Sequence, residues 1–370
     1  MTLLTRGSPR VAYFYSVPDT STFRYRAYNV AQSLSVHASA ARPSAAWFTA
    51  ADFEQMDRVL SACDILVLCR NSLYNDQIAR LAAQARARGR RILFDVDDLV
   101  FDPAYTHLLI DTLGLDMRNP AVWDYWFSYI GRVAATFALA DGVLVTNSYL
   151  GARAEAWSGK PSRVLPNFLN REQQEISDRI WSAKETGGWA RDGRINLGYF
   201  SGSPSHNRDF SLVSHAIAEL MDENSAIWLQ IVGFLEPGSE LARHQARIQP
   251  LPLQDFVNLQ RAIGTVEINL VPLQDNPFTH CKSELKWFEA AIVGALTVAS
   301  PTEAYRNVID HGSNGWISSA HVWKETLTDI VRDLDDTRAK VAPRARAEAR
   351  DRFGWDQQAA CIEAALFDNW

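Results

Sequence analysis

Two stretches of the sequence place basic and polar side chains where an anionic ligand could bind. In the first, Lys282 and Ser283 precede a segment of helical period that carries Glu289 and ends at Gly294. A helix N-terminus presents unpaired backbone N–H groups, and a neighbouring lysine adds a full positive charge. We expect Ser283 to cap this helix, Lys282 to bind a phosphate, and Glu289 to accept hydrogen bonds from a vicinal diol such as ribose. The spacing alone fits an ordinary surface helix equally well.

The second stretch, residues 198–210, follows a strand-like run and reads GYFSGSPSHNRDF. Glycine lets a backbone approach a ligand closely, and arginine can hold a phosphate through two parallel hydrogen bonds. The alternative is a serine-rich turn between a strand and a helix, capped by Asn207 or Asp209. Together with the first stretch, we favour phosphate binding here. The candidate residues are Gly202, Ser203, His206 and Arg208.

Three carboxylates, Asp95, Asp97 and Asp98, stand at the carboxyl end of an apolar run. One interpretation is a site for Mg²⁺ or Mn²⁺, since an Asp-x-Asp pattern suits these ions with sugar diphosphates. The other is a cluster that only caps the next segment.

A pair of arginines and a cluster of aromatic residues are further candidates for ligand binding. Arg24 and Arg26 come after the first expected strand and open a helix, so they are expected to point toward a cleft and contact phosphate or an acidic sugar. Two surface arginines on an amphipathic helix are the equal alternative. An aromatic cluster could stack on sugar rings or contact a lipid interface, although a core stripe is its commoner use. Its members are Trp123, Tyr125, Trp126 and Phe127.

The elements that must position these residues follow from hydrophobic periodicity. Short apolar runs alternate with stretches of helical period, which indicates strand–helix–strand units and parallel sheets. Helices are expected at residues 75–88, 122–139 and 357–367. Strands are expected at residues 11–15, 65–68, 92–96 and 143–146, and in a second series at 195–200, 227–232, 267–271 and 296–299.

A polar segment with two adjacent glycines separates the two series and indicates a linker, with room for one amphipathic helix. We therefore predict an α/β protein with two Rossmann-like, doubly wound domains. Open sheets of this kind bind ligands beyond the carboxyl ends of their strands, which places the cleft between the domains. The predicted units are residues 1–168, a linker at 169–194, residues 195–350, and a C-terminal helix at 351–370. The place where this helix docks is left open, and packing back on the first domain is one option.

Composition excludes several classes of protein. The chain has 370 residues, 47% of them hydrophobic, which excludes a disordered or fibrous protein. A net charge of -6 argues against a nucleic-acid partner. The four cysteines match neither a zinc pattern nor a disulfide framework. Neither a signal peptide nor an apolar stretch long enough to span a membrane is present, so a cytoplasmic protein is expected.

The residues from Glu289 to Ser300 resemble the C-terminal-domain signature of family-4-like glycosyltransferases (glycosyl transferases group 1), which have the GT-B fold. In that family two glutamates, separated by seven residues, hold the donor sugar and the nucleotide ribose. The second corresponds to Glu289, but the first falls on Cys281, and a thiol cannot accept two sugar hydroxyls as a carboxylate does. Glu284 is three residues from that position.

Other segments extend the resemblance over nearly the whole chain. Residues 198–210 resemble the family's diphosphate-binding loop, and residues 231–234 resemble a strand end near the nucleobase. Residues 140–148 and 164–167 resemble the last two strand ends of the N-terminal domain, where Asn147 and Asn167 are expected to be turn residues. Asp97 falls on the position of a histidine that faces the donor sugar, an interpretation we prefer to metal binding.

The resemblance implies a bacterial enzyme of hexosyltransferase type in polysaccharide biosynthesis. It would move a sugar from a nucleotide-diphosphate donor to a hydroxyl of a glycan, glycolipid or polysaccharide, with retention of configuration and without a metal or other cofactor. Peripheral contact with the inner face of a membrane is compatible with this role. The alternatives are an epimerase of the same fold and a nucleotide-sugar-binding module without catalysis. The implied catalytic residues are Asp97, Arg208 and Lys282, and the implied donor-binding residues are Gly202, Ser203, His206, Lys282, Ser283 and Glu289.

Overall fold

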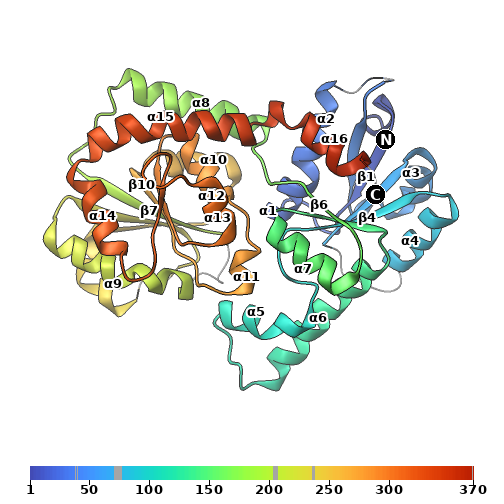
Figure 1. Cartoon of the computed structure of the whole chain (residues 1–370), viewed down its shortest axis with the longest axis horizontal. Coiled ribbons are helices and arrows are strands. Elements are labelled where there is room, and N and C mark those ends of the chain that lie inside the picture. The colour runs from blue at the N-terminus through green and yellow to red at the C-terminus, as the bar shows by residue number, and fades with distance from the viewer. Residues whose placement is uncertain (38, 40, 71–76, 203–206, 236–237, 369) are drawn as a thin grey trace.

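The chain forms two α/β domains that lie side by side, each built around a six-stranded parallel sheet (Figure 1). The structure is a computed structural model and describes residues 1–370 except 38, 40, 71–76, 203–206, 236–237 and 369. Helices cover both faces of each sheet, which buries apolar side chains on both sides of the central strands. The predicted fold class, two doubly wound Rossmann-like domains, is confirmed.

The N-terminal sheet has the strand order β2-β1-β3-β4-β5-β6. Its four central strands were predicted from their apolar runs, and the structure confirms them. The strands are β1 (Arg10–Phe14), β2 (Ser44–Phe48), β3 (Ile65–Cys69), β4 (Arg91–Val96), β5 (Gly142–Val145) and β6 (Ser162–Val164).

Helices of the N-terminal domain connect these strands. The longest, α6, begins at Pro120 after an Asn119 cap, close to its predicted start. A π-helical turn, Arg24–Tyr28, separates α1 from α2. The helices are α1 (Ser21–Phe23), α2 (Asn29–His37), α3 (Met56–Ala62), α4 (Gln77–Ala87), α5 (Thr106–Thr112), α6 (Pro120–Ala138) and α7 (Ser148–Ser158).

The C-terminal sheet has the order β12-β11-β10-β7-β8-β9. Its strands are β7 (Ile195–Ser201), β8 (Ile227–Gly233), β9 (Ile248–Leu251), β10 (Ile268–Val271), β11 (Leu296–Ala299) and β12 (Trp316–Ile317). Its helices are α9 (Asn207–Glu223), α10 (Phe256–Gly264), α11 (Pro277–His280), α12 (Leu285–Ala291), α13 (Glu303–Val308), α14 (Trp323–Arg332) and α15 (Leu334–Phe353).

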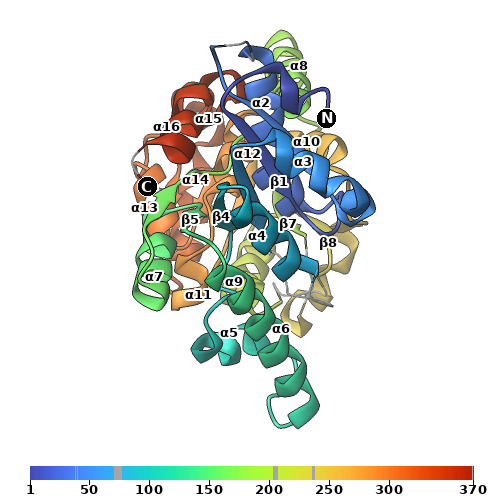
Figure 2. The ribbon, with the colours of Figure 1, turned by 90° about the vertical axis from the view of Figure 1, so that its right-hand side faces the viewer.

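The chain crosses between the domains twice. The first crossing includes α8 (Arg171–Thr186), which begins with a capping box formed by Asn170 and Gln173. The second follows α15, after which α16 (Ala359–Phe367) lies beside α2 of the N-terminal domain (Figure 2). Gly142 in β5 leaves room for the Trp370 ring, which lies where a Cβ atom at that position would sit. The C-terminal segment is therefore part of the packing of the N-terminal domain.

In the part of the chain that the structure describes, no helix combines the length and the apolarity that crossing a bilayer would require.

Candidate functional site

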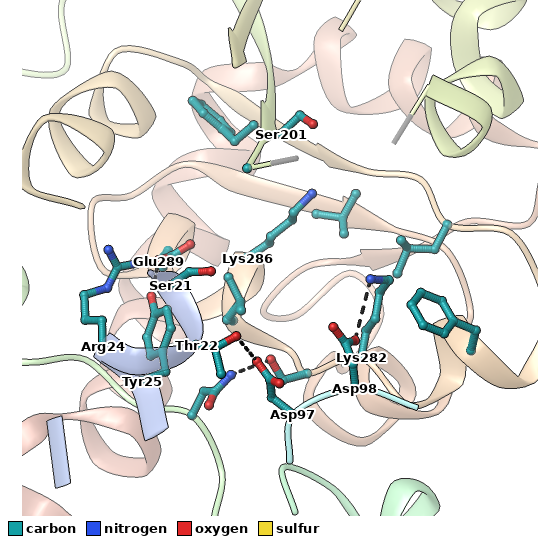
Figure 3. Close-up of a pocket in the computed structure, with 18 of the residues that line it drawn as sticks. Ser21, Thr22, Arg24, Tyr25, Asp97, Asp98, Ser201, Lys282, Lys286 and Glu289 are labelled. Carbon is teal, nitrogen blue, oxygen red and sulfur yellow. Dashed lines mark hydrogen bonds and ion pairs between the residues drawn. The ribbon is translucent and has the colours of Figure 1, made fainter. Parts of the chain in front are cut away.

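A cavity of about 560 Å³ lies between the two domains at the carboxyl ends of both sheets. This is where doubly wound domains bind ligands, because loops and helix starts converge there. The N-terminal domain contributes residues that include Thr22, Arg24, Tyr25, Arg70, Asp97, Asp98 and Asn167. The C-terminal domain contributes residues that include Ser201, Gly202, Lys282, Ser283, Lys286 and Glu289 (Figure 3).

Asp97 and Asp98 follow β4 and are held by groups on two other elements. Thr22 Oγ1 donates to Asp97 Oδ2 at 2.6 Å (Figure 3). Arg70 Nη1 donates to Asp97 Oδ1 at 3.0 Å and to Asp98 Oδ2 at 3.3 Å. Burial by itself would raise the pKa of Asp97, but the Arg70 charge and the Thr22 hydrogen bond outweigh burial and lower the pKa below its ordinary value. Asp97 is therefore a fixed negative charge at the cavity wall.

Two lysines of the C-terminal domain line the cavity. Lys282 Nζ lies 3.8 Å from Asp98 Oδ1, an ion pair between the domains. Lys286 points from α12 toward the end of β7 at Ser201 (Figure 3). Burial lowers the pKa of Lys286 to about 8. The two ammonium groups give this side of the cavity the positive charge that a diphosphate requires.

Glu289 lies on the same face of α12 as Lys286 and is only 3% exposed. Its Oε1 accepts a hydrogen bond from the Tyr25 hydroxyl of the N-terminal domain and one from Gln173 Nε2 at 3.4 Å. Burial raises its pKa. The carboxylate is thus at the predicted place, but it is already engaged across the domain boundary.

Arg24 completes this corner of the cavity. Its guanidinium lies 4.8 Å from the Tyr25 ring centroid and 5.0 Å from that of Phe256 in the C-terminal domain. Among the described residues Arg24 Nε has no hydrogen-bond partner. Arg24 lines the cavity, which confirms the expectation that it faces the cleft.

We expected Ser283 to cap the helix, and this expectation was wrong. The helix begins at Leu285 after Glu284 and ends at Ala291, before the predicted end at Gly294. The Ser283 hydroxyl instead accepts a hydrogen bond from Asn167 Nδ2 at 2.9 Å. The loop before α12 is held from the N-terminal domain, and this long-range support replaces a local cap.

Asn147 provides the second support for this loop. Its Nδ2 donates to the carbonyl oxygens of Cys281 at 3.0 Å and Lys282 at 3.2 Å, while its side-chain oxygen caps α7. Asn147 and Asn167 are thus more than turn residues, because both also hold the lysine-bearing loop in place.

Arg26 does not face the cleft, and this expectation was wrong. Its Nε and Nη2 donate to Asp95 at 2.7 and 3.1 Å, and its Nη1 donates to Leu165 O at 2.5 Å and to Asn167 Oδ1 at 3.1 Å. Residues two apart on a helical turn lie on nearly opposite sides, so Arg24 and Arg26 cannot share a face. Asp95 is likewise fully buried, so the three carboxylates do not form one site.

Cys281, at the position of the first glutamate in the resemblance, is not among the described residues that line the cavity. The Cys281 thiol is buried against the N-terminal core, and burial raises its pKa to about 12. Among the described residues, no group of three or more His, Cys, Asp and Glu side chains is arranged to hold a metal ion.

The loop after β7 is described only in part. Ser201 and Gly202 line the cavity, whereas Ser203 and His206 lie outside the described residues. Arg208 is 49% exposed and forms an ion pair with Asp111 of α5, and it is not among the described residues that line the cavity. Its assignment to the diphosphate stays a prediction.

A pair of variants tests Arg208. The ion pair with Asp111 is one explanation of Arg208. In that case Arg208→Ala and Asp111→Ala should lower kcat equally and by less than about tenfold, because exposed ion pairs contribute roughly 0–1 kcal/mol. Steady-state kinetics of both variants provide the measurement. A much larger loss of kcat in Arg208→Ala alone would instead assign the arginine to the diphosphate.

Several lining residues were not predicted from the sequence. Lys286 precedes Glu289 by three positions, and this spacing on a helix could have indicated that the two share a face. No sequence pattern links Thr22 and Arg70 to Asp97, because these residues are far apart in the sequence and come into contact only in the folded protein.

Comparison with solved structures shows that the fold is that of GT-B proteins. HepE from Anabaena, in complex with UDP-glucose, is 13% identical over 96% of this chain and 99% of that one, with a TM-score of 0.62. Sucrose-phosphate synthase from Thermosynechococcus elongatus is 14% identical, covering 95% and 96%, with a TM-score of 0.62. WaaG, a glycosyltransferase involved in lipopolysaccharide biosynthesis, is 12% identical, covering 96% and 100%, with a TM-score of 0.58. No protein-family model and no curated protein matches the sequence.

Proposed function

We propose that this GT-B-fold chain is a glycosyltransferase that moves a sugar from a nucleotide-diphosphate donor to a hydroxyl acceptor. The main support for the proposal is the cavity between the domains. Lys282, Lys286 and Glu289 line it on one side, and Asp97 lines it on the other. The similar structures support it, since HepE was solved with UDP-glucose and WaaG is described as a glycosyltransferase.

The donor would bind mainly to the C-terminal domain. Its diphosphate would lie between Lys282, Lys286 and the loop at Ser201 and Gly202, where two cations and close backbone approach are available. Its ribose would reach Glu289, and the Arg24 charge would face the nucleotide from the opposite domain. This arrangement places the sugar near Asp97.

The transfer breaks the bond between the anomeric carbon and the diphosphate oxygen and forms a bond from that carbon to the acceptor oxygen. The bonding electron pair leaves with the nucleoside diphosphate, which also receives the acceptor's proton. Lys282 and Lys286 would stabilise the charge that develops on the diphosphate. Because the pKa of Asp97 is lowered, this carboxylate suits stabilisation of positive charge at the anomeric carbon better than proton removal.

Retention of configuration, independence of metal ions and a hexose as the transferred sugar are further parts of the proposal. Metal independence rests on the two lysines, which supply the positive charge that a divalent ion would otherwise give. Full activity in EDTA would support it.

The experiment begins with thermal unfolding in the presence of UDP, GDP, ADP or dTDP, because a ligand that binds only the native state raises apparent stability. The matching labelled sugar nucleotide is then incubated with acceptors, and transfer of label is measured. Transfer supports the proposal. Conversion of the donor sugar to its epimer would show an epimerase, and binding without turnover would show a module that has lost catalysis.

Tyr25→Phe tests the place of the ribose. Without nucleotide, the variant should lose about 1–3 kcal/mol of unfolding free energy, because buried Glu289 loses a donor. With saturating nucleotide the loss should shrink, since ribose hydroxyls can donate instead. Urea unfolding with and without the nucleotide measures both values. Tyr28→Phe is the matched control, because its hydroxyl lies 3.5 Å from Glu172 in a half-buried place. An equal loss in both conditions would argue against ribose at Glu289.

A further inference from the structure

Helix α6 belongs partly to the core and partly to the surface. Its second half buries Ile130, Val133 and Phe137, and Phe137 stacks on Phe94 of β4 with ring centroids 4.9 Å apart. Its first half extends, together with α5, away from the body of the N-terminal domain (Figure 2). This first half carries several aromatic side chains, of which Trp126 and Tyr129 are half-buried against the core, whereas Tyr125 and Phe127 are exposed.

Three of these aromatic side chains, Tyr125, Trp126 and Tyr129, line the cavity between the domains. At about 100° per residue they fall within one side of the helix, whereas Phe127 falls on the opposite side. Their rings meet edge to face, with centroids 5.2 Å apart for Tyr125 and Trp126 and 5.7 Å apart for Trp126 and Tyr129. Tyr125 is nevertheless 61% exposed. We call these three residues the aromatic face of α6.

The aromatic face continues into the acidic wall of the cavity. Tyr129 and Arg70 both line the cavity, and Arg70 is the residue that holds Asp97 and Asp98. Apolar ring surface and hydrogen-bonding groups therefore lie next to each other along one wall. None of the three aromatic residues is on the C-terminal domain, where the donor would bind.

A sugar ring has the chemistry that matches this wall. Its C–H groups form an apolar face with partial positive charge, which is attracted to the negative face of an aromatic ring, and its hydroxyls form a polar edge. A lipid chain would gain nothing from the charged groups beside the rings. We propose that the aromatic face of α6 binds a pyranose ring of a carbohydrate acceptor and presents its hydroxyl toward Asp97. The inference rests on the proposed function and specifies its acceptor class.

The test uses the donor that the wild-type protein hydrolyses, chosen from UDP-glucose, GDP-mannose, ADP-glucose and dTDP-glucose. The acceptors are methyl glucoside, galactoside and mannoside, set against dodecanol in detergent. We expect transfer to at least one glycoside. For that acceptor kcat/KM should fall about tenfold in Trp126→Ala and about threefold in the exposed variant Tyr125→Ala, the range found for aromatic contacts. Donor hydrolysis and nucleotide affinity should stay unchanged.

Phe127→Ala is the matched control, because Phe127 is 53% exposed on the opposite side of the same helix. It should leave transfer to the glycoside unchanged. Transfer to dodecanol alone, donor hydrolysis without transfer to any glycoside, or an equal loss in the Phe127 variant would overturn the inference. Failure of the proposed function would look different, since then no donor would bind or be hydrolysed. If Trp126→Ala fails to fold, Tyr125→Ala decides the outcome.

Discussion

Replacement of Arg26 with methionine should lower the free energy of unfolding by about 3–5 kcal/mol. Asp95 is fully buried, and without Arg26 its carboxyl group loses the cation that pairs with it. The same guanidinium also donates to Leu165 O and to Asn167 Oδ1, so the strand end that supports Ser283 loses two donors. Urea unfolding of the purified variant, followed by tryptophan fluorescence, measures the effect.

Two controls show whether the buried charge is the cause. Arg118→Met removes an arginine that is 92% exposed and pairs with Asp116, and it should change the unfolding free energy by less than about 0.5 kcal/mol. The double variant Arg26→Met with Asp95→Leu removes both charges, and it should regain more than about half of the loss, since an apolar pair often replaces a buried ion pair without penalty. A double variant as unstable as the single one would contradict this explanation.

The second large effect is expected at Lys286. Lys286→Met should lower kcat/KM for sugar transfer by about 10²–10³-fold, because in the proposed binding mode it removes a positive charge that stabilises the leaving diphosphate. The fold should tolerate the change, since a buried ammonium is replaced by an apolar chain. Steady-state kinetics and thermal unfolding of the variant test the two statements separately. Lys324→Met, at a surface ion pair, should stay within about twofold of the wild type.

The pH dependence of nucleotide binding gives an independent test of Lys286. Its pKa is about 8, so the side chain is charged below that pH and loses its charge above it. The affinity for the nucleotide should therefore be highest below pH 8, where Lys286 is charged. As the pH rises above this value, the affinity should fall by up to about tenfold per pH unit. Titration calorimetry across this range measures the change. In Lys286→Arg the side chain stays charged over this pH range, so the loss of nucleotide affinity near pH 8 should disappear. If the loss persists in this variant, another group is responsible for it.

Central strands could be predicted from the sequence because they are buried on both faces. β1, β3, β4 and β5 consist mainly of apolar residues, and so do β7 and β8. The strands that were not predicted lie at or near sheet edges. β9 reads IQPL and includes Pro250, which usually argues against a strand, and β12 has only two residues. Such segments become strands only because a neighbouring strand is already in place.

The candidate site was predictable where a residue's neighbours in sequence carry the signal. Lys282 and Glu289 were found from a local pattern, and both line the cavity. Thr22 and Asp97, in contrast, are 75 positions apart and meet only after the sheet has formed. Ser283 was misassigned as a cap because its actual partner, Asn167, belongs to the other domain. Contacts between domains leave no periodic trace in a sequence.

The packing of α16 on α2 has a consequence for synthesis of the protein on the ribosome. The strands of the N-terminal sheet, which end at Val164, leave the ribosome long before residues 355–370 are made. During that interval the surface around Ser33, which later donates to Trp355 O at 3.0 Å, and the place of the Trp370 ring beside Gly142 stay open to water. The first domain to emerge is thus the one completed last, and its nascent form offers an uncovered apolar surface on which chaperones could act.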